Sequence, residues 1–165
     1  MKTIILTGMP GSGKTSVGKL LAQVLNMEFI DSDFEIEKSE NLTISQIFEL
    51  KGEKYFRNIE HEIIKQIFKS QNQILSIGGG AFENPQTQEF LLNNANVIYL
   101  QASPEIIYQR TRSDNTRPLL KDNNSDKIKK LLQNREKNYK LARFTVLTDN
   151  KDVETIVREI CKCVN

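Results

Sequence analysis

The residues with the clearest chemistry in this chain of 165 residues form a glycine-rich loop near its start. Residues 8–15 read GMPGSGKT and match G-x-x-x-x-G-K-[ST] at every fixed position, after an apolar run at residues 3–7. Such glycines let successive backbone N–H groups point at one phosphate, while Lys14 can reach the β- and γ-phosphates and the Thr15 hydroxyl can bind Mg²⁺. The loop therefore predicts a nucleoside triphosphate site. We expect the phosphate contacts to come from Gly11, Ser12, Gly13, Lys14, Thr15 and Ser16.

Two acidic residues end the apolar run at residues 28–31. Near a phosphate-bound metal ion, one of Asp31 and Asp33 can hold Mg²⁺ through water, and the other can orient or deprotonate an attacking hydroxyl. Alternatively, Asp33 caps a helix over residues 34–39. We favour the catalytic interpretation because both carboxylates follow a strand beside the phosphate loop, where ligands of parallel sheets gather.

Three consecutive glycines at residues 78–80 end another strand-like run. Glycines fill no core and cost backbone entropy, so this triplet indicates close approach of the backbone to a ligand, rather than a flexible turn. Several arginines complete the set of candidates. Any one of them could be a solvated surface charge, but together they supply the cations that transfer of a γ-phosphoryl group requires. They are Arg57, Arg110, Arg112, Arg117 and Arg135.

Strand-like and helix-like segments alternate along the chain, which predicts a three-layer α/β/α fold around a five-stranded parallel sheet. The expected strands are residues 3–7, 28–31, 73–78, 96–100 and 144–148. Between them, apolar residues recur at helical spacing, and Asn84 and Ser103 each precede a proline as an N-cap would. Thr43 is expected to open a short helix that Gly52 closes.

Composition excludes several classes of protein. A net charge of +2 without a basic tail argues against nucleic-acid binding, and no apolar run is long enough to cross a membrane. Cys161 and Cys163 with a single histidine, His61, cannot complete a four-ligand zinc site, so we expect helix-borne thiols in a reducing cytoplasm and a solvated histidine. No acidic residue ends an internal strand as in motor ATPases, and the N-K-x-D motif of GTPases fails at Val153.

These motifs together resemble the shikimate kinase family over essentially the whole chain. The matching segments are GMPGSGKT at 8–15, FIDSD at 29–33, FRNIE at 56–60, IGGG at 77–80, TRPLL at 116–120, and Arg135 with Tyr139. Many families share the phosphate loop, but the combination at these spacings is far more specific. The resemblance implies a cytoplasmic P-loop kinase, expected to be monomeric, that transfers the γ-phosphoryl group of ATP to the 3-hydroxyl of shikimate in chorismate and aromatic amino-acid biosynthesis.

The resemblance also implies roles around the nucleotide. Lys14 would neutralise the β- and γ-phosphates, Thr15 would hold Mg²⁺, and Asp31 would support the metal through water. Arg117 would swing in from a lid toward the phosphates as a catalytic cation, and Arg110 would lie near the adenine.

For the acceptor, the resemblance implies a second set of contacts. Asp33 would bind the substrate hydroxyls and is the candidate base. Arg57 and Arg135 would pair with the substrate carboxylate, and Gly79 and Gly80 would donate backbone N–H groups.

Within a single domain spanning 1–165, the substrate-binding segment is expected over about 33–61 and the lid over about 111–124. Phe48 and Phe56 would either wall the acceptor ring or belong to the core.

Two other kinase classes and one binding class compete with this interpretation. The GMPG start of the phosphate loop, with its unusual pair Met9-Pro10, is similar to nucleoside monophosphate kinases, but the D-G-[FY]-P-R stretch of those enzymes is absent after residue 78. A gluconate-type sugar kinase would also accept a carboxylated polyol, and the two arginines do not exclude it. A nucleotide-regulated module without turnover is disfavoured by the intact lysine, threonine and aspartates.

Overall fold

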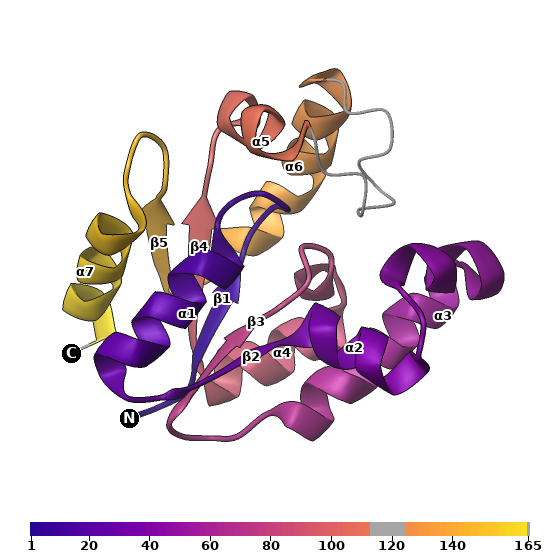
Figure 1. The fold of residues 1–165 in the computed structure, drawn as a ribbon, viewed down its shortest axis with the longest axis horizontal. Coiled ribbons are helices and arrows are strands. Elements are labelled where there is room, and N and C mark those ends of the chain that lie inside the picture. Colours follow the sequence, from indigo (N-terminus) through magenta and orange to yellow (C-terminus); the bar gives the residue numbers. More distant parts are fainter. Residues whose placement is uncertain (113–124, 165) are drawn as a thin grey trace.

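Five parallel strands form one sheet in the computed structural model, which describes residues 1–112 and 125–164 (Figure 1). The strands lie in the order β2-β3-β1-β4-β5, so the first strand of the chain is central. Their bounds are β1 (Ile4–Thr7), β2 (Glu28–Asp31), β3 (Gln73–Ser76), β4 (Asn96–Gln101) and β5 (Phe144–Leu147). Because all five run the same way, their carboxyl ends share one edge, and this edge carries the phosphate loop.

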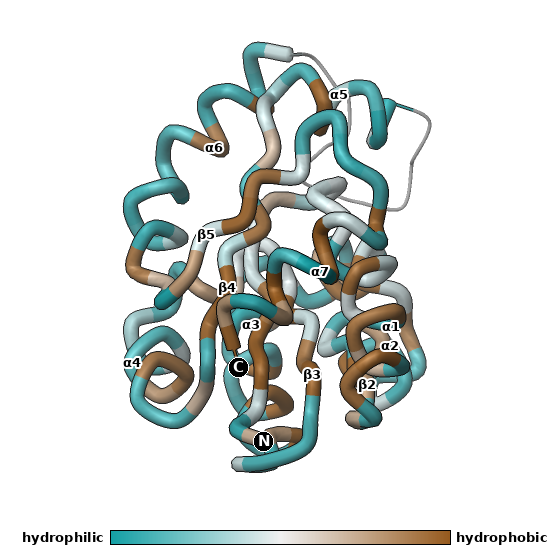
Figure 2. The backbone as a smooth tube through the Cα atoms, turned by 90° about the vertical axis from the view of Figure 1, so that its left-hand side faces the viewer, coloured by the Kyte–Doolittle hydropathy of each residue, from teal (hydrophilic) through white to brown (hydrophobic). Residues whose placement is uncertain are grey.

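Helices cover both faces of the sheet, as the alternating pattern predicts. The helices are α1 (Lys14–Leu25), α2 (Ser32–Glu40), α3 (Ile44–Ile67), η1 (Ala81–Glu83), α4 (Pro85–Asn94), α5 (Pro104–Thr111), α6 (Ser125–Tyr139) and α7 (Val153–Val164). Figure 2 shows α4 and α6 on one side of the strands and α1 on the other. The predicted three-layer α/β/α fold is confirmed. Among the helices described, none is long and apolar enough to span a bilayer.

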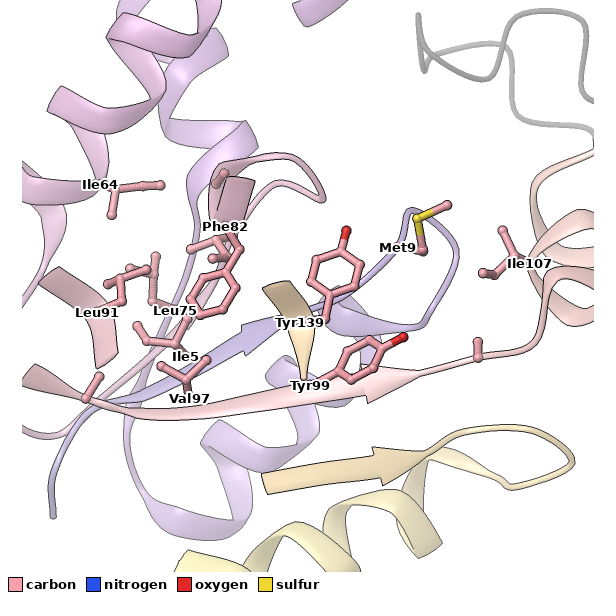
Figure 3. Close-up of a cluster of buried hydrophobic side chains, with 14 of the residues drawn as sticks. Ile5, Met9, Ile64, Leu75, Phe82, Leu91, Val97, Tyr99, Ile107 and Tyr139 are labelled. Atoms are coloured by element: carbon pink, nitrogen blue, oxygen red, sulfur yellow. The ribbon is translucent and has the colours of Figure 1, made fainter. Parts of the chain in front are cut away.

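Successive residues of a strand point to opposite faces of the sheet and pack into two separate cores. In β1, Ile4 and Leu6 pack with the α1 and α7 side chains, whereas Ile5 packs on the opposite face against α3, α4 and α6. This division follows from the two-residue period of a strand, and burial on both faces explains why the strands are continuously apolar. Figure 3 shows the second core, in which Met9 of the phosphate loop lies beside Ile107 of α5.

Local signals account for the way α2 and α3 begin and end. Thr43 forms a capping box with Gln46, and the chain departs from helical geometry at Gly52, where φ is 81° and ψ is 166°. Thr43 therefore opens α3 and Gly52 interrupts it as predicted. The chain then resumes as helix to Ile67, as the helical spacing of the apolar residues from Phe56 onward predicts.

Three further details differ from the sequence predictions or refine them. The third strand ends at Ser76 rather than residue 78. Helix α2 begins at Ser32 because the Asp31 side chain accepts the backbone N–H of Asp33, so Asp31 is the cap and Asp33 is not. His61 is not simply solvated: it is half-buried, and its Nδ1 lies 2.7 Å from Thr87 Oγ1 of α4.

Candidate active site

The phosphate loop has the backbone geometry that its glycines permit. Gly11 and Gly13 adopt φ of 80° and 95°, a left-handed region that disfavours other residues, and Gly13 immediately precedes α1. Lys14 is buried, and its Nζ donates to the carbonyl oxygens of Gly8 (2.9 Å) and Met9 (3.0 Å). The loop is thus folded around its own lysine, with the positive end of α1 behind it.

A cleft of about 460 Å³ opens at this loop and extends to the end of β2. It is lined by Gly11, Gly13, Lys14, Thr15, Ser16, Asp31, Asp33, Phe34, Glu37, Ser76 and Arg110. All the loop residues expected to contact ATP line it except Ser12, which is fully buried. Phe34, Glu37 and Ser76 were not singled out by the sequence patterns, because nothing in their types or spacing sets them apart from ordinary helix and strand residues.

Side-chain oxygens that could bind a metal ion lie together where the end of β2 meets the start of α1. The Thr15 hydroxyl donates to Asp31 Oδ2 at 2.9 Å, and Asp31 Oδ1 accepts the Asp33 backbone N–H at 3.1 Å. A hydroxyl and a carboxylate in contact are the hard oxygen ligands that suit Mg²⁺, which binds few protein groups and completes its shell with water and phosphate. The residues present therefore fit a metal ion bridged to a bound triphosphate.

The glycine triplet meets the two predicted substrate arginines. A Cβ atom at Gly80 would lie 2.4 Å from Arg57 Nη2, and one at Gly79 would lie 3.4 Å from Arg135 Nη1. A side chain at Gly80 would push the Arg57 guanidinium aside, whereas at Gly79 the tight neighbours are Pro10 Cδ at 2.9 Å and the Gly8 carbonyl oxygen at 3.2 Å. Arg135 is 5% exposed. The structure thus gathers Arg57, Arg135, Gly79 and Gly80 from three distant segments.

Three of the other expected residues can be placed and one cannot. Arg110 donates to Gly11 O at 3.3 Å and to the Thr148 carbonyl at 3.3 Å, so it borders the phosphate loop. Phe56 is buried in a core cluster, with its ring centroid 4.8 Å from that of Phe48. Arg117 and most of the expected lid lie outside the described residues.

Comparison with known proteins identifies the family. The shikimate kinase family model matches residues 10–165. A curated shikimate kinase of Caldicellulosiruptor saccharolyticus is 44% identical over 163 residues, which cover 97% of this chain and 94% of that protein. This chain belongs to the shikimate kinase family. The members of this family are ATP-dependent kinases, and this chain is accordingly one of them.

Solved structures agree with this family assignment. The shikimate kinase from Acinetobacter baumannii, solved in complex with shikimate, superposes with a TM-score of 0.95 at 36% identity, covering 99% of this chain and 93% of that one. A gluconokinase from Sinorhizobium meliloti superposes with a TM-score of 0.57 at 19% identity, covering 96% of this chain and 88% of that one. The second likeness shows a shared fold only.

Glu60 is a family-motif residue that the sequence analysis quoted without giving it a role. Its carboxylate is 2% exposed and accepts from Arg57 Nη1 at 2.7 Å. Its Oε1 and the Oδ1 of Asp33 both approach Gly78, 2.6 and 2.7 Å from the place of a Cβ atom. Burial raises the pKa of Glu60 to about 7, against the opposing pull of Arg57. The spacing of Arg57 and Glu60, one helical turn apart, was the available signal.

Proposed function

We propose that this shikimate kinase family member transfers the γ-phosphoryl group of ATP to the 3-hydroxyl of shikimate, giving shikimate 3-phosphate and ADP. The proposal rests on one observation. Lys14, the Thr15–Asp31 pair and Asp33 share one cleft. Next to it, Arg57 and Arg135 lie against Gly80 and Gly79, just after the end of β3. A triphosphate site and a site for a small carboxylate are therefore next to each other, as a direct transfer requires.

At the nucleotide side, this chain would bind and neutralise the phosphates. Backbone N–H groups of residues 11–16 would surround the β-phosphate, and Lys14 would exchange its carbonyl partners for phosphate oxygens. Thr15 would bind Mg²⁺ directly and Asp31 would hold it through water. When bound, the metal ion supplies charge neutralisation on the β- and γ-oxygens. Arg110 would border the adenine, and Arg117 is proposed as a further catalytic cation.

At the acceptor side, the guanidinium groups would hold the carboxylate of shikimate. Arg57 and Arg135 both lie against the glycines that follow β3. Arg135 is buried and the Arg57 side chain is 21% exposed, so ion pairs formed there are partly shielded from water and stronger than on a surface. Gly79 and Gly80 would add backbone N–H donors. This clamp fixes the ring so that a hydroxyl faces Asp33, which lines the nucleotide cleft.

The transfer itself forms one bond and breaks another. The acceptor hydroxyl oxygen bonds to the γ-phosphorus as the bond from that phosphorus to the bridging β,γ-oxygen breaks, and ADP leaves with the electron pair. The hydroxyl proton passes to the Asp33 carboxylate. Because phosphoryl transfer has a loose transition state, most of the acceleration would come from positioning and from the cations around the γ-phosphoryl group.

A coupled ADP-release assay with shikimate, gluconate and AMP as separate acceptors tests the proposal. We expect turnover with shikimate that far exceeds turnover with the other two. Turnover with AMP or gluconate alone would contradict it. ATP binding without turnover on any acceptor would favour the nucleotide-regulated module.

The variant Arg57→Ala tests the proposed carboxylate clamp. We expect the KM for shikimate to rise roughly ten- to hundredfold, because a charge-assisted hydrogen bond is lost, while the KM for ATP stays within a few fold. Arg143→Ala is the matched control, since Arg143 contacts Asn96 and the Phe144 ring away from the cleft. Equal losses for both substrates would contradict the clamp.

A further inference from the structure

Tyr139 is a buried polar residue that the proposed chemistry does not use. It is the last residue of α6 and lies one helical turn after Arg135, so the two side chains occupy the same helix face. Its side chain is fully buried, and its hydroxyl donates a hydrogen bond to the Gly79 carbonyl oxygen, 60 residues away in sequence. Burial raises the pKa of Tyr139 to about 12, so this hydroxyl keeps its proton and remains a donor at neutral pH.

The hydrogen bond reaches the backbone where three parts of the site meet. A Cβ atom at Gly79 would lie 2.9 Å from Pro10 Cδ, 3.2 Å from the Gly8 carbonyl oxygen and 3.4 Å from Arg135 Nη1. The phosphate loop, the glycine triplet and α6 therefore converge on a single peptide unit. A group that sets the orientation of this peptide affects both the glycine donors and the arginine beside them.

The geometry of a trans peptide gives this contact its consequence. The carbonyl of Gly79 and the N–H of Gly80 belong to the same planar unit and point in opposite directions. By holding the carbonyl on the α6 side, Tyr139 turns the N–H of Gly80 the other way. Neither Gly79 nor Gly80 has a side chain to restrain this peptide, which is the central unit of a turn closed by the Ala81 N–H and the Gly78 carbonyl oxygen at 3.0 Å.

We propose that Tyr139 is a positioning residue: its hydroxyl fixes the Gly79–Gly80 peptide so that the Gly80 N–H donates to the carboxylate of the acceptor. This inference rests on the proposed function, since it assumes that the acceptor carboxylate binds at the glycine triplet. It assigns a role to the Tyr139 hydroxyl that is separate from the packing of its ring.

A neighbouring tyrosine provides a matched control. Tyr99 of β4 stacks on Tyr139 with ring centroids 5.0 Å apart and an interplanar angle of 27° (Figure 3). Its hydroxyl is also buried but has no hydrogen-bond partner among residues 1–112 and 125–164. The variants Tyr139→Phe and Tyr99→Phe each remove one buried hydroxyl and keep the stacked rings. The first removes the bond to the glycine triplet together with the hydrogen bond between the Tyr139 hydroxyl and Arg135, and the second removes neither.

Steady-state kinetics of the two variants tests the inference. For Tyr139→Phe we expect the KM for shikimate to rise roughly tenfold, since one donor to the carboxylate is misdirected, with kcat and the KM for ATP within about twofold to threefold. For Tyr99→Phe all three constants should stay within about twofold. Equal rises in both KM values, or the same effect in the two variants, would overturn the inference.

A second hydrogen bond joins α6 to the segment after β3. It distinguishes an effect of the Tyr139 hydroxyl on Gly79 from an effect of the packing of α6 as a whole. Asn138 Nδ2 donates to Glu83 Oε1 of η1 at 2.9 Å without touching Gly79. If Asn138→Ala raises the KM for shikimate as much as Tyr139→Phe does, docking of α6 is responsible and the role of the hydroxyl is refuted. We expect Asn138→Ala to lower the thermal midpoint of unfolding and to leave the KM for shikimate nearly unchanged.

An acceptor analogue makes the test specific for the carboxylate. Calorimetric titration with shikimate should show weaker binding to Tyr139→Phe, whereas an analogue with hydroxymethyl in place of the carboxylate should bind wild type and variant alike. An equal loss for both compounds would overturn the inference. The backbone amide resonance of Gly80 should shift in Tyr139→Phe but not in Tyr99→Phe, which is a readout independent of activity.

The outcomes distinguish this inference from the function on which it rests. If wild type fails to phosphorylate shikimate, the proposed function fails and the inference falls with it. If wild type turns over and Tyr139→Phe is indistinguishable from it, the proposed function stands and only the role of Tyr139 is overturned.

Discussion

Among single residues, Glu60 shows most clearly how burial and neighbouring charges compete. Removal from water raises its pKa to about 7, the nearby Asp33 carboxylate adds to the rise, and Arg57 and Arg135 oppose it. Among the described residues, its Oε1 has no hydrogen-bond partner. A buried carboxylate in this position is costly to ionise, and it sits between the proposed base and the proposed clamp.

The variant Glu60→Gln should change how stability depends on pH. The folded protein holds the Glu60 proton more tightly than the unfolded chain, whose group titrates near 4.5. The wild-type free energy of unfolding therefore loses a contribution on the order of 3 kcal/mol as pH rises from below 4.5 through about 7. Urea unfolding at pH 5 and pH 8 should show that the free energy of unfolding of the glutamine variant, relative to that of wild type, is higher at pH 8 than at pH 5.

The matched control for this measurement is Glu53→Gln. Glu53 is the other carboxylate partner of Arg57, but its side chain is 58% exposed. The Glu53→Gln variant should show the same dependence of the free energy of unfolding on pH as wild type. If Glu60→Gln also ran parallel to wild type, the raised pKa of Glu60 would be contradicted.

Asp33→Asn tests the proposed base. If Asp33 accepts the hydroxyl proton, kcat should fall by roughly 10²- to 10⁴-fold, with the KM for ATP little changed. A fall of only a few fold would leave Asp33 as a group that orients the acceptor. Glu35→Gln on the same helix serves as the control, because Glu35 does not line the cleft.

Among the elements, α2 and α3 hold the acceptor side of the site to the sheet. Asp31 caps α2, and Glu37 Oε1 accepts the N–H of Ile44 at 2.9 Å where α3 begins. Helix α3 then carries Arg57 and Glu60 beyond the interruption at Gly52. These short-range contacts fix the direction of the helix, so they affect stability more than chemistry.

Thr43→Ala should show this separation. Loss of the capping box leaves backbone donors at the start of α3 without their side-chain partner, so the free energy of unfolding should fall by about 1 kcal/mol. The kinetic constants should stay within about twofold. Thr43→Ser, which keeps a hydroxyl, should recover most of the loss in a urea titration. A large rise in the KM for shikimate would show instead that this cap helps to place Arg57.

For the molecule as a whole, the strand order determines where ligands bind. With β1 central and β3 beside it, the phosphate loop and the glycine triplet leave neighbouring strands at the same edge. Ligands that bind this edge contact several segments at once, and they should stabilise the folded state against global unfolding.

Magnesium and ATP together should raise the stability of the wild-type protein. At a concentration one hundred times the dissociation constant, the expected gain is about 2.7 kcal/mol, measurable as a higher thermal midpoint. Chelation of the metal with EDTA should reduce the gain, because Thr15 and Asp31 then lack the ion that joins them to the phosphates. Lys14→Met should abolish most of it. An equal gain with and without the metal ion would contradict the proposed magnesium site.

The sequence by itself determined the strands, most helix starts and the phosphate loop, because periodicity, caps and glycine conformation depend on near neighbours. It also carried the family resemblance that the comparisons confirmed. Only the tertiary structure decided that Arg57 lies on Gly80, that Arg135 lies on Gly79, and that Glu60 is buried beside Asp33. These contacts join residues far apart in the chain, and they exist because strand order and helix packing bring the carboxyl ends of β2 and β3 together.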